Sequence, residues 1–525
     1  MCGIIGLISN ESTQNNYNRN LVNDIHIGLV GLQHRGQDAV GICNEKSIIK
    51  KVGLVKNLFQ NMEYVEQMRE TLKGNMLMGH VRYLTSGNDN ESSIQPLDIN
   101  VKDTTNVTHN IKMCHNGNIL NVDTLQNAID EHSVDSDDDG GGNNSDSAID
   151  SDSDKSLNDD VISDSSLLLK LIAILIKKQN FASLDTNQQI QKIFDIVQYL
   201  HTIIIGSYNL LIHINNFGLI VIRDKFGIRP LSYAKKAKTY LFASEDNIYN
   251  TLNYSKINDI GPGETIIFNY HTNKLHHDTY SKSYLSPCLF EYIYFARSDS
   301  TIDKINVYKS RQLMGEILGN FINKQYGKLW CNGMSIFQYN DLDIDIIVPV
   351  PETGRLYAYG VQKVINKPIV EALVKNNYID RTFIMETQGK IINNINSKFT
   401  VVNEMVRGKN ILIVDDSIVR GNTSRRINQL FRQAGVKKIY FASGSPRIYF
   451  PNHYGINIKT SSELICHQKT DEQVAQDICA DKVIFNDLDV ITKALKKMNK
   501  NIDRFETSIF NNIHLYKQIS NDSFT

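Results

Sequence analysis

From about residue 287 onward, helical stretches alternate with short, fully apolar runs that end in acidic residues or proline. The three clearest runs are DIDIIVPVPET from Asp343, NILIVDDS from Asn410 and KKIYFASGSP from Lys437. A strand that is apolar on both sides must be covered on both faces, and intervening helices supply that cover. The pattern therefore predicts a parallel α/β sheet in the second half of the chain.

The first half of the chain has a different rhythm, with brief strands bounded by Gly, Asn and Asp. The expected strands are GIIGLI, AVGIC, MLMGHV and KMCHNG, and strand character returns over residues 201–247. A helix is expected over 20–32, and Ser163 or Asp164 is expected to cap a second helix. Such strands are typical of a packed sandwich, and the change of rhythm predicts a domain boundary near 270–290.

One segment of the first half is too polar to join a core. Ser133–Asp160 contains ten Asp, seven Ser, three consecutive Gly and a single Lys, so we expect a disordered surface insertion. The formal charge of the whole chain is −1, which gives no indication of a nucleic-acid partner. The most apolar stretch, Leu167–Ile176, is interrupted by Lys170 and is far shorter than the ~20 residues of a membrane span. With no secretory signal after Met1, we expect a soluble cytoplasmic protein without a membrane partner.

Seven cysteines are scattered along the chain, and no two of them form a CxxC pair. An odd, dispersed set argues against a disulfide framework and against a local zinc or iron–sulfur site. Cys2 is special by position, because removal of Met1 would leave it with a free α-amino group. That amine has a near-neutral pKa and lies beside the thiol, so it can serve as the base in nucleophilic catalysis. By position alone, a buried packing role for Cys2 is the more common one.

Cys2 is followed along the chain by three polar segments, HRG at 34–36, GHVR at 79–82 and HNG at 115–117. Arg82 carries a planar fork of donors that suits a substrate carboxylate. The side-chain amide of Asn116 and the backbone N–H of Gly117 suit a developing oxyanion. Seen singly, Arg82 is more typical of a surface ion pair, and Asn116-Gly117 of a hairpin turn.

In this order the four segments resemble the N-terminal-nucleophile glutamine amidotransferases, which share an MCGI start followed by HRG, GHVR and HNG. The resemblance implies that Cys2 attacks the glutamine carboxamide and that Asn116 and Gly117 form the oxyanion hole. It also implies that Arg82 binds the substrate carboxylate and that Asp164 binds the substrate α-amino group.

The strongest local signal is the run NILIVDDSIVRGNTS, which begins at Asn410. A buried strand ends in Asp415 and Asp416, and open α/β sheets bind ligands at the carboxyl ends of their strands. Ser417–Thr423 then leads into a helix, whose N-terminus can present backbone N–H groups to a phosphate. An Asp-Asp pair alone is more typical of a generic strand–turn–helix in which Asp416 caps the helix.

The complete VDDSIVRG run resembles the 5-phosphoribosyl 1-pyrophosphate (PRPP) loop of the type I phosphoribosyltransferases. The resemblance implies that Asp415 and Asp416 contact the ribose hydroxyls and that the following loop holds the 5′-phosphate. The two aspartates are also the candidate ligands of Mg²⁺, which would neutralise the pyrophosphate leaving group. The loop residues expected at PRPP are Ser417, Ile418, Val419, Arg420, Gly421, Asn422 and Thr423.

Two further segments complete this second candidate site. Glu352, Thr353 and Gly354 follow the first apolar run and resemble the family's pyrophosphate-binding loop, although Pro-rich turns of this kind are common for conformational reasons alone. Residues 386–403 occupy the place of the family's flexible loop over PRPP and carry fewer basic residues than related loops. Lys398 is the best candidate for a cation of this loop.

Taken together, the two constellations are similar to those of the amidophosphoribosyltransferase family, and the similarity includes the junction segment Pro287–Arg297. It implies a four-layer αββα N-terminal-nucleophile hydrolase domain at 2–275, an α/β parallel-sheet type I phosphoribosyltransferase domain at 285–490 and a C-terminal extension at 491–525. It also implies that ammonia released at Cys2 travels through a closed internal passage to PRPP. The product would be 5-phosphoribosylamine, in the first step of de novo purine synthesis.

The resemblance also implies cofactors and partners. Glutamine and PRPP are the expected substrates, Mg²⁺ the expected cofactor, purine nucleotides the expected inhibitors and a homo-oligomer (tetramer or dimer) the expected assembly. Of the family's two subtypes, the one without a propeptide and an iron–sulfur cluster fits a chain that starts at Met1-Cys2, so no cluster is expected.

Two alternatives stay open. A glutamine-dependent sugar-phosphate aminotransferase would open with the same kind of half but would need sugar-isomerase domains after it. A non-catalytic PRPP-sensing regulator would have no reason to keep a glutaminase half built on Cys2.

Overall fold

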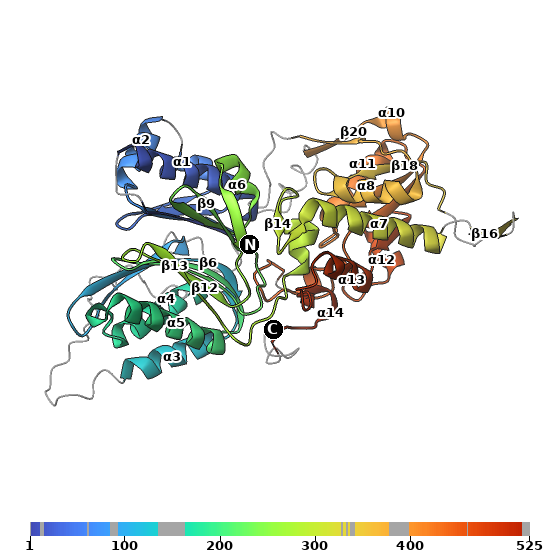
Figure 1. Ribbon diagram of the computed structural model, residues 1–525. Coiled ribbons are helices and arrows are strands. Elements are labelled where there is room, and N and C mark those ends of the chain that lie inside the picture. The colour runs from blue at the N-terminus through green and yellow to red at the C-terminus, as the bar shows by residue number, and fades with distance from the viewer. Residues whose placement is uncertain are drawn as a thin grey trace.

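The computed structural model describes residues 2–10, 15–59, 62–83, 93–134, 163–326, 329–331, 334–336, 342–376, 398–458 and 460–516. Most of the acidic insertion Ser133–Asp160 and most of the expected flexible loop at 386–403 lie outside the described residues. The described chain forms two halves that lie side by side, and its N-terminal end lies at their junction (Figure 1).

The first half contains two antiparallel sheets. The first sheet has seven strands in the order β11 (Ser255–Asp259), β9 (Ser232–Lys236), β10 (Thr239–Ala243), β1 (Gly3–Ser9), β4 (Met76–Arg82), β2 (Ala39–Cys43) and β3 (Ile48–Val52). The second sheet has six strands in the order β13 (Lys274–Thr279), β12 (Glu264–Asn269), β8 (Gly218–Arg223), β7 (Gly206–Ile214), β6 (Thr108–Ile119) and β5 (Leu97–Lys102). An apolar layer fills the space between the sheets, where Ile4 and Ile8 of β1 belong to one cluster with Leu211 of β7 and Leu219 of β8.

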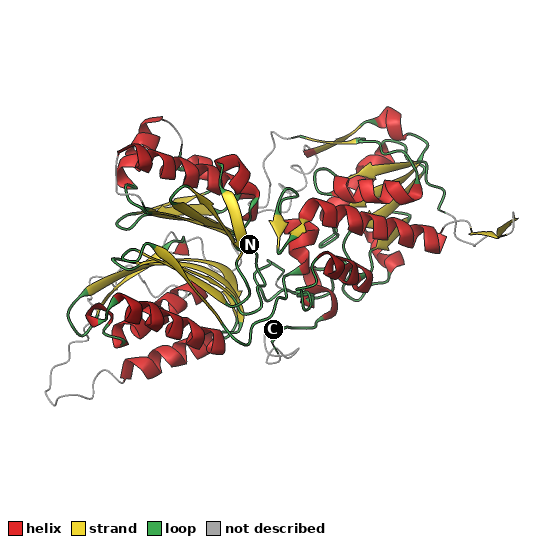
Figure 2. Ribbon diagram, in the orientation of Figure 1, coloured by secondary structure: helices red, strands yellow, loops and turns green. Residues whose placement is uncertain are grey.

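Helices cover the outer face of each sheet (Figure 2). The first sheet shares a core with α1 (Asn15–Gly31), α2 (Met62–Thr71) and α6 (Asn247–Leu252). The second shares a core with α3 (Val122–Val134), α4 (Asp164–Lys178) and α5 (Thr186–Ile203). The short turns η1 (Gln33–Arg35), η2 (Val55–Asn57) and η5 (Phe181–Ser183) are 3₁₀ helices. This helix–sheet–sheet–helix order confirms the αββα architecture expected from the sequence.

Burial explains why these strands are so apolar. Two helix boundaries differ from the prediction. β1 is buried along its whole length, whereas β5 at a sheet edge alternates between half-buried and exposed residues. α1 begins at Asn15 rather than at residue 20. Thr202 and Ile203 end α5 instead of opening a strand, because the run TIII has no periodicity of its own and follows a helix with buried residues at helical spacing.

The second half contains a four-stranded parallel sheet in the order β18 (Ile346–Pro349), β21 (Asn410–Asp415), β22 (Lys438–Ser443) and β23 (Lys482–Phe485). One face packs against α7 (Val307–Tyr326), α8 (Gly354–Ile365) and α13 (Leu488–Met498). The other packs against α11 (Asn422–Gln433) and α12 (Asp471–Asp477). Alternate residues of β21 enter the two cores, so the apolar runs are strands covered on both faces, as the sequence predicts.

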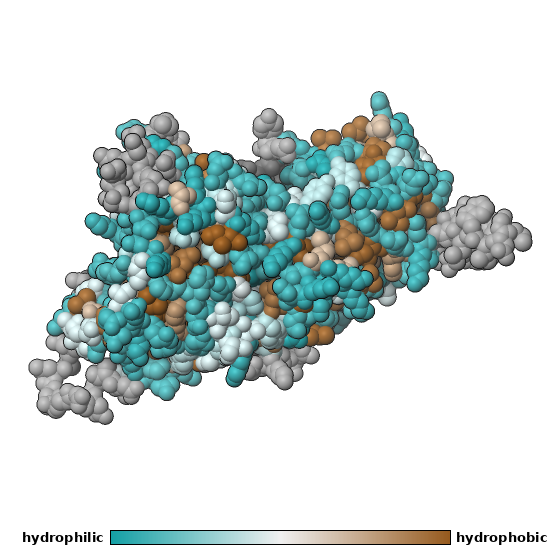
Figure 3. Space-filling model, viewed as in Figure 1, coloured by the Kyte–Doolittle hydropathy of each residue, from teal (hydrophilic) through white to brown (hydrophobic). Residues whose placement is uncertain are grey.

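Smaller elements complete the described chain. Three ribbons pair β14 (Thr301–Ile302) with β15 (Ile305–Asn306), β16 (Leu329–Cys331) with β17 (Met334–Ile336) and β19 (Leu373–Lys375) with β20 (Phe399–Val401). Short helical elements are η6 (Glu291–Phe295), a π-helical turn, and α10 (Asn403–Val406), η7 (Ser461–Glu463) and α14 (Ser508–Asn511). On the face seen in Figure 3, hydrophobic residues form small groups among hydrophilic ones. In the described part of the chain, no helix is both long and apolar enough to cross a membrane.

Candidate active sites

The structure places Cys2 beside the end of the strand that carries Arg82. Cys2 directly precedes β1, and β1 pairs with β4 so that Gly3 lies opposite Val81. The Cys2 sulfur lies 3.9 Å from the carbonyl oxygen of Tyr83, the residue that follows Arg82. Both Cys2 and Arg82 are half-buried. The predicted nucleophile and the predicted carboxylate clamp are therefore near neighbours.

The HRG segment packs directly beneath this pair. A Cβ atom added to Gly36 would lie 2.6 Å from backbone atoms of Val81 and Arg82, so only glycine fits there. The side chain of Arg35 is buried, and its Nε donates a hydrogen bond of 3.1 Å to the carbonyl of Cys2. The sequence pattern singled out the HRG segment but assigned no role to Arg35.

Asn116 and Gly117 lie inside β6, not in a hairpin turn and not after a strand. Asn116 is 1% exposed, and its Nδ2 has no hydrogen-bond partner among the described residues. A Cβ on Gly117 would lie 1.9 Å from the carbonyl oxygen of Ser207, so the neighbouring strand β7 requires glycine here. A buried amide donor without a partner is costly unless a ligand or water satisfies it. Such a donor is suited to an oxyanion.

Asp164 is held against the end of β6. It is the first residue of α4, and Ser163 is the N-cap, whose Oγ accepts a hydrogen bond from the N–H of Ser166 at 3.1 Å. One oxygen of Asp164 accepts from the backbone N–H of Ile119 at 2.9 Å, and the other from that of Ser165 at 2.7 Å. The carboxylate therefore lies at a helix N-terminus and contacts Ile119, which is three residues after Asn116 of the predicted oxyanion hole.

His115 connects these groups. Its backbone N–H donates to the side-chain oxygen of Gln95 at 2.6 Å, and its Nδ1 lies 2.8 Å from Ser165 Oγ. Burial lowers the pKa of His115, so the neutral ring is favoured. Ile4 lies two residues after Cys2, and Cys114 lies two residues before Asn116. Both belong to the apolar layer between the sheets. The four predicted segments thus meet at one end of the sandwich.

The second predicted site lies at the carboxyl end of the parallel sheet. Asp415 ends β21 and Asp416 follows it, as predicted. Burial raises the pKa of Asp415 well above its ordinary value, and the neighbouring charge of Asp416 adds to the rise. Burial also raises the pKa of Asp416, although hydrogen bonds from Ser417 and Thr353 oppose it. The two carboxylates are therefore buried and close together, and a nearby positive charge would favour their ionised forms.

The predicted pyrophosphate loop is adjacent to this pair, because β18 and β21 are neighbours in the sheet. The hydroxyl of Thr353 donates a hydrogen bond to Asp416. A Cβ on Gly354 would lie 2.4 Å from the carbonyl oxygen of Val414, so α8 can begin this close to β21 only with glycine. Glu352 is exposed and forms an ion pair with Arg355.

The predicted phosphate loop is shorter than expected. α11 begins at Asn422, so Asn422 and Thr423 belong to its first turn, which presents backbone N–H groups. Gly421 has φ +76°, a left-handed conformation that favours glycine. The side chain of Ile418 is buried in the core, so this residue offers the loop its backbone.

Three other predicted residues have contacts within the protein. Arg420 donates from Nε to Glu463 at 3.0 Å, and the carbonyl of Val419 accepts a hydrogen bond of 2.9 Å from Ile465. Lys398 directly precedes β20 and lies over the ring of Phe399, 5.8 Å from its centroid. Contact of Lys398 with PRPP stays a prediction.

The aspartate pair is the part of this site that fits a divalent cation. A nearby cation favours the charged forms of buried carboxylates. Among the described residues, no group of three or more His, Cys, Asp or Glu side chains could hold a metal by itself. Mg²⁺ fits such a sparse set, since it is commonly held by one or two carboxylates together with substrate phosphates and water.

Comparison with known proteins identifies the family. A family model described as a phosphoribosyl transferase domain matches residues 330–443. An amidophosphoribosyltransferase of Pasteurella multocida is 35% identical, with 99% of this chain and 94% of the relative covered. One from Haemophilus influenzae is 34% identical, with the same coverage. The solved glutamine PRPP amidotransferase of B. subtilis, complexed with ADP and GMP, is 27% identical and covers 99% of both chains with a TM-score of 0.73. The chain belongs to the amidophosphoribosyltransferase family.

Proposed function

We propose that this chain hydrolyses glutamine at Cys2 and transfers the ammonia to the anomeric carbon of PRPP. The products are 5-phosphoribosylamine, pyrophosphate and glutamate, and the reaction is the first step of de novo purine synthesis. The observation that carries the proposal is the presence of both constellations in one chain: Cys2 beside Arg82 in an αββα half, and Asp415 with Asp416 at the end of a parallel sheet.

In the glutamine step, removal of Met1 exposes the Cys2 amine, which accepts the thiol proton. The thiolate attacks the carboxamide, and Asn116 Nδ2 with the Gly117 N–H stabilises the oxyanion. Arg82 binds the substrate carboxylate through its planar fork. Asp164 accepts hydrogen bonds from the substrate ammonium. The Cys2 ammonium returns this proton to the substrate nitrogen, and collapse of the tetrahedral intermediate releases ammonia and leaves a thioester that water cleaves.

In the phosphoribosyl step, Asp415 and Asp416 bind the ribose hydroxyls, and the first turn of α11 receives the 5′-phosphate on its backbone N–H groups. The segment Glu352–Gly354 lies where the pyrophosphate would leave. Asp415 and Asp416 would hold Mg²⁺ together with the pyrophosphate, and the ion would neutralise charge on the leaving group. Ammonia must arrive unprotonated, because ammonium has no lone pair with which to attack. A closed passage between the halves is therefore part of the proposal.

We also propose that the chain consists of a glutaminase part at 2–275, a phosphoribosyltransferase part at 285–490 and an extension at 491–525, and that it forms a cytoplasmic homo-oligomer. Purine nucleotides are proposed as inhibitors, and the B. subtilis relative solved with ADP and GMP supports this. No iron–sulfur cluster is included, because no CxxC pair occurs. Stoichiometric iron in the purified protein would contradict that part.

Of the alternatives, the sugar-phosphate aminotransferase would need sugar-isomerase domains where the phosphoribosyl transferase model matches. The non-catalytic regulator would have no use for the buried Asn116 Nδ2 donor, which has no hydrogen-bond partner among the described residues.

The decisive assay measures pyrophosphate release from PRPP with glutamine and, separately, with ammonia. The proposal expects both nitrogen sources to support release, with one glutamate formed per pyrophosphate when glutamine is used. A sugar phosphate in place of PRPP should give no glutamine-dependent product. The proposal would be refuted if neither glutamine nor ammonia supported pyrophosphate release, or if the product were an aminated sugar phosphate.

A further inference from the structure

The junction between the two halves contains a buried carboxylate, Glu291, that two arginines share. Glu291 is the first residue of η6 and is 1% exposed. It accepts two hydrogen bonds from the guanidinium of Arg35, at 2.8 and 3.2 Å, and one from Arg229 at 3.4 Å. A Glu within the otherwise apolar run PCLFEYIYFA is costly to bury, and its arginine partners offset that cost.

Arg35 connects Glu291 to the nucleophile. While two of its nitrogens bind Glu291, its Nε binds the carbonyl of Cys2 at 3.1 Å. Burial disfavours the Arg35 charge, but Glu291 and Glu245 outweigh that effect, and the pKa of Arg35 is raised above its ordinary value. The guanidinium is therefore a permanent cation, fixed on both sides by carboxylates. Its Nε–H donates to the backbone carbonyl of Cys2, the residue that reacts.

Arg229 connects Glu291 to the second half of the chain. Its Nε donates to the carbonyl of Tyr454 at 3.0 Å, and Ser207 Oγ donates to the same oxygen at 2.9 Å. The next carbonyl upstream, that of His453, accepts a hydrogen bond of 2.9 Å from Asn118. The loop at 453–455 thus touches both Arg229 and the strand of the predicted oxyanion hole.

Gly455 shows how closely this loop approaches the oxyanion strand. A Cβ placed on Gly455 would lie 3.4 Å from the carbonyl oxygen of Gly117, and φ at this glycine is +99°. A side chain there would be strained by its backbone conformation. The loop therefore packs on the back of Gly117, from the half of the molecule that carries the predicted PRPP site.

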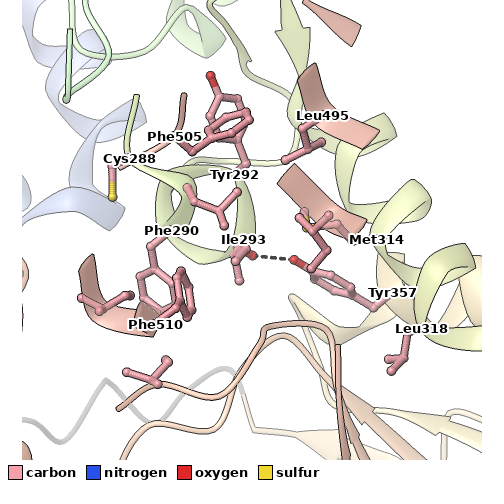
Figure 4. Close-up of a cluster of buried hydrophobic side chains, with 14 of the residues drawn as sticks. Cys288, Phe290, Tyr292, Ile293, Met314, Leu318, Tyr357, Leu495, Phe505 and Phe510 are labelled. Carbon is pink, nitrogen blue, oxygen red and sulfur yellow. Dashed lines mark hydrogen bonds between the residues drawn. The ribbon is translucent and has the colours of Figure 1, made fainter. Parts of the chain in front are cut away.

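The other side of η6 is held by the phosphoribosyl half. Tyr357 of α8 donates a hydrogen bond of 3.0 Å to the carbonyl of Ile293, and Figure 4 shows this bond inside a cluster of buried aromatic and aliphatic side chains. Arg311 of α7 donates to the carbonyls of Tyr292 and Tyr294, both at 3.0 Å. α8 begins at the predicted pyrophosphate loop. η6 is therefore held on one side by α8, which follows this loop, and on the other by the hydrogen bonds of Glu291 to Arg35 and Arg229.

We propose that Glu291 is a positioning residue for Cys2: it orients Arg35, and through Arg35 the nucleophile, from an element held by the phosphoribosyl half. Glu291 touches neither substrate. Its loss therefore shifts the geometry of the reacting thiol without removing a group that binds glutamine or PRPP. Misplacement of a reacting group by about 1 Å can reduce a rate by about 100-fold.

The test is Glu291→Gln, which keeps the shape of the side chain and removes its charge. The inference rests on the proposed function and uses its assay. For the glutamine-driven reaction we expect kcat to fall by about 10- to 100-fold, while KM for glutamine and the ammonia-driven rate stay within about twofold of the unaltered protein. A simple loss of folded protein would instead lower both rates in the same proportion.

Glu506→Gln is the matched control. Glu506 is also 1% exposed and lies at the same junction, where its backbone pairs with Cys288. Its carboxylate accepts a hydrogen bond of 2.7 Å from Ser508 and has none to Arg35 or Arg229 among the described residues. This variant should show no selective loss of the glutamine-driven kcat. If Glu291→Gln does not fold, Arg229→Lys decides the question, because a lysine cannot hold Glu291 and the Tyr454 carbonyl in the same forked geometry.

The outcomes separate cleanly. A selective fall in the glutamine-driven kcat for Glu291→Gln or Arg229→Lys, absent in Glu506→Gln, supports the inference. Rates equal to those of the unaltered protein, a proportional loss of both rates per folded molecule, or a rise in KM for glutamine with kcat unchanged would overturn the inference alone. An unaltered protein that releases no pyrophosphate with either nitrogen source would overturn the proposed function as well.

Discussion

The hydroxyl of Thr353, at the N-terminus of α8, donates a hydrogen bond to the carboxylate of Asp416, just beyond β21. The two residues are 63 positions apart in sequence. The strands that precede them, β18 and β21, are neighbours in the parallel sheet. The hydrogen bond joins the predicted pyrophosphate loop to the predicted ribose-binding pair. It also opposes the rise that burial causes in the pKa of Asp416.

Thr353→Val should therefore weaken phosphoribosyl transfer and shift its pH dependence. Loss of the hydrogen bond raises the pKa of Asp416 further, so the acidic limb of the ammonia-driven rate moves to higher pH. A hydrogen bond to a charged group is worth about 1.5–3 kcal/mol, or roughly 10- to 150-fold in rate. A pH–rate profile with ammonia as nitrogen source measures both effects. Thr202→Val, at an exposed threonine of α5, is the control. An acidic limb that does not move would remove Thr353 from this role.

Asn116→Ala should abolish most glutamine use. The buried Nδ2 has no partner among the described residues, and removal of one oxyanion-hole donor lowers kcat by about 100- to 1000-fold. Steady-state kinetics with glutamine should show this loss, and the rate with ammonia should be unchanged. Asn209, opposite Asn116 on β7, donates to the carbonyl of Pro230 at 2.9 Å. Asn209→Ala should therefore spare the glutamine-driven kcat per folded molecule. Similar losses in both variants would argue against the oxyanion role.

Asp164→Asn should raise KM for glutamine. The substitution removes the negative charge that would pair with the substrate ammonium, at a cost of about 1.5–3 kcal/mol. KM should therefore rise roughly 10- to 150-fold while the ammonia-driven rate is unchanged. Asp185→Asn is a matched control, because Asp185 caps α5 outside the site and accepts hydrogen bonds from Asn187 and Gln188. An unchanged KM in Asp164→Asn would contradict the assignment.

The stability of the first half should depend on pH through Asp224. This carboxyl is fully buried after β8, and burial raises its pKa to about 6. In the unfolded chain the carboxyl loses its proton near pH ~4. Between these values the folded state binds more protons, so the free energy of unfolding falls as pH rises, by about 3 kcal/mol. The contribution is fully present below pH ~4 and lost as pH rises through 6.

Asp224→Asn removes this proton and should flatten the pH dependence of stability between pH ~4 and ~6. Urea denaturation at several pH values measures the slope. Asp195→Asn, at an exposed position of α5, should leave the slope unchanged. A slope that persists in Asp224→Asn would assign the pH dependence to another group.

Much of the fold and of both sites follows from local sequence patterns. The strand NILIVD ends in Asp415 because a parallel strand must be apolar until it leaves the sheet. Cys2 directly precedes a strand, and Arg82 and Asn116 lie on strands that the sequence pattern indicates. The glycines of HRG and HNG are explained by close backbone contacts that the sequence alone does not show. The family resemblance supplied roles that these patterns could not.

The junction was not predictable in this way. Arg35 and Glu291 are 256 residues apart, and Arg229 and Glu291 are 62 apart. No periodicity links such charges, because their pairing depends on how the two halves pack. The available signal was the lone Glu in PCLFEYIYFA, since a charge inside an apolar segment needs a buried partner. The lone Glu predicts that a buried partner exists but not which residue it is.

The central claim is a division of labour between Cys2 and the phosphoribosyl half. The most direct test compares PRPP-dependent pyrophosphate release in the unaltered protein and in Cys2→Ala, with glutamine and with ammonia. The account predicts that Cys2→Ala loses the glutamine-driven rate and retains the ammonia-driven rate. Loss of both rates to the same extent, or retention of the glutamine-driven rate, would contradict it.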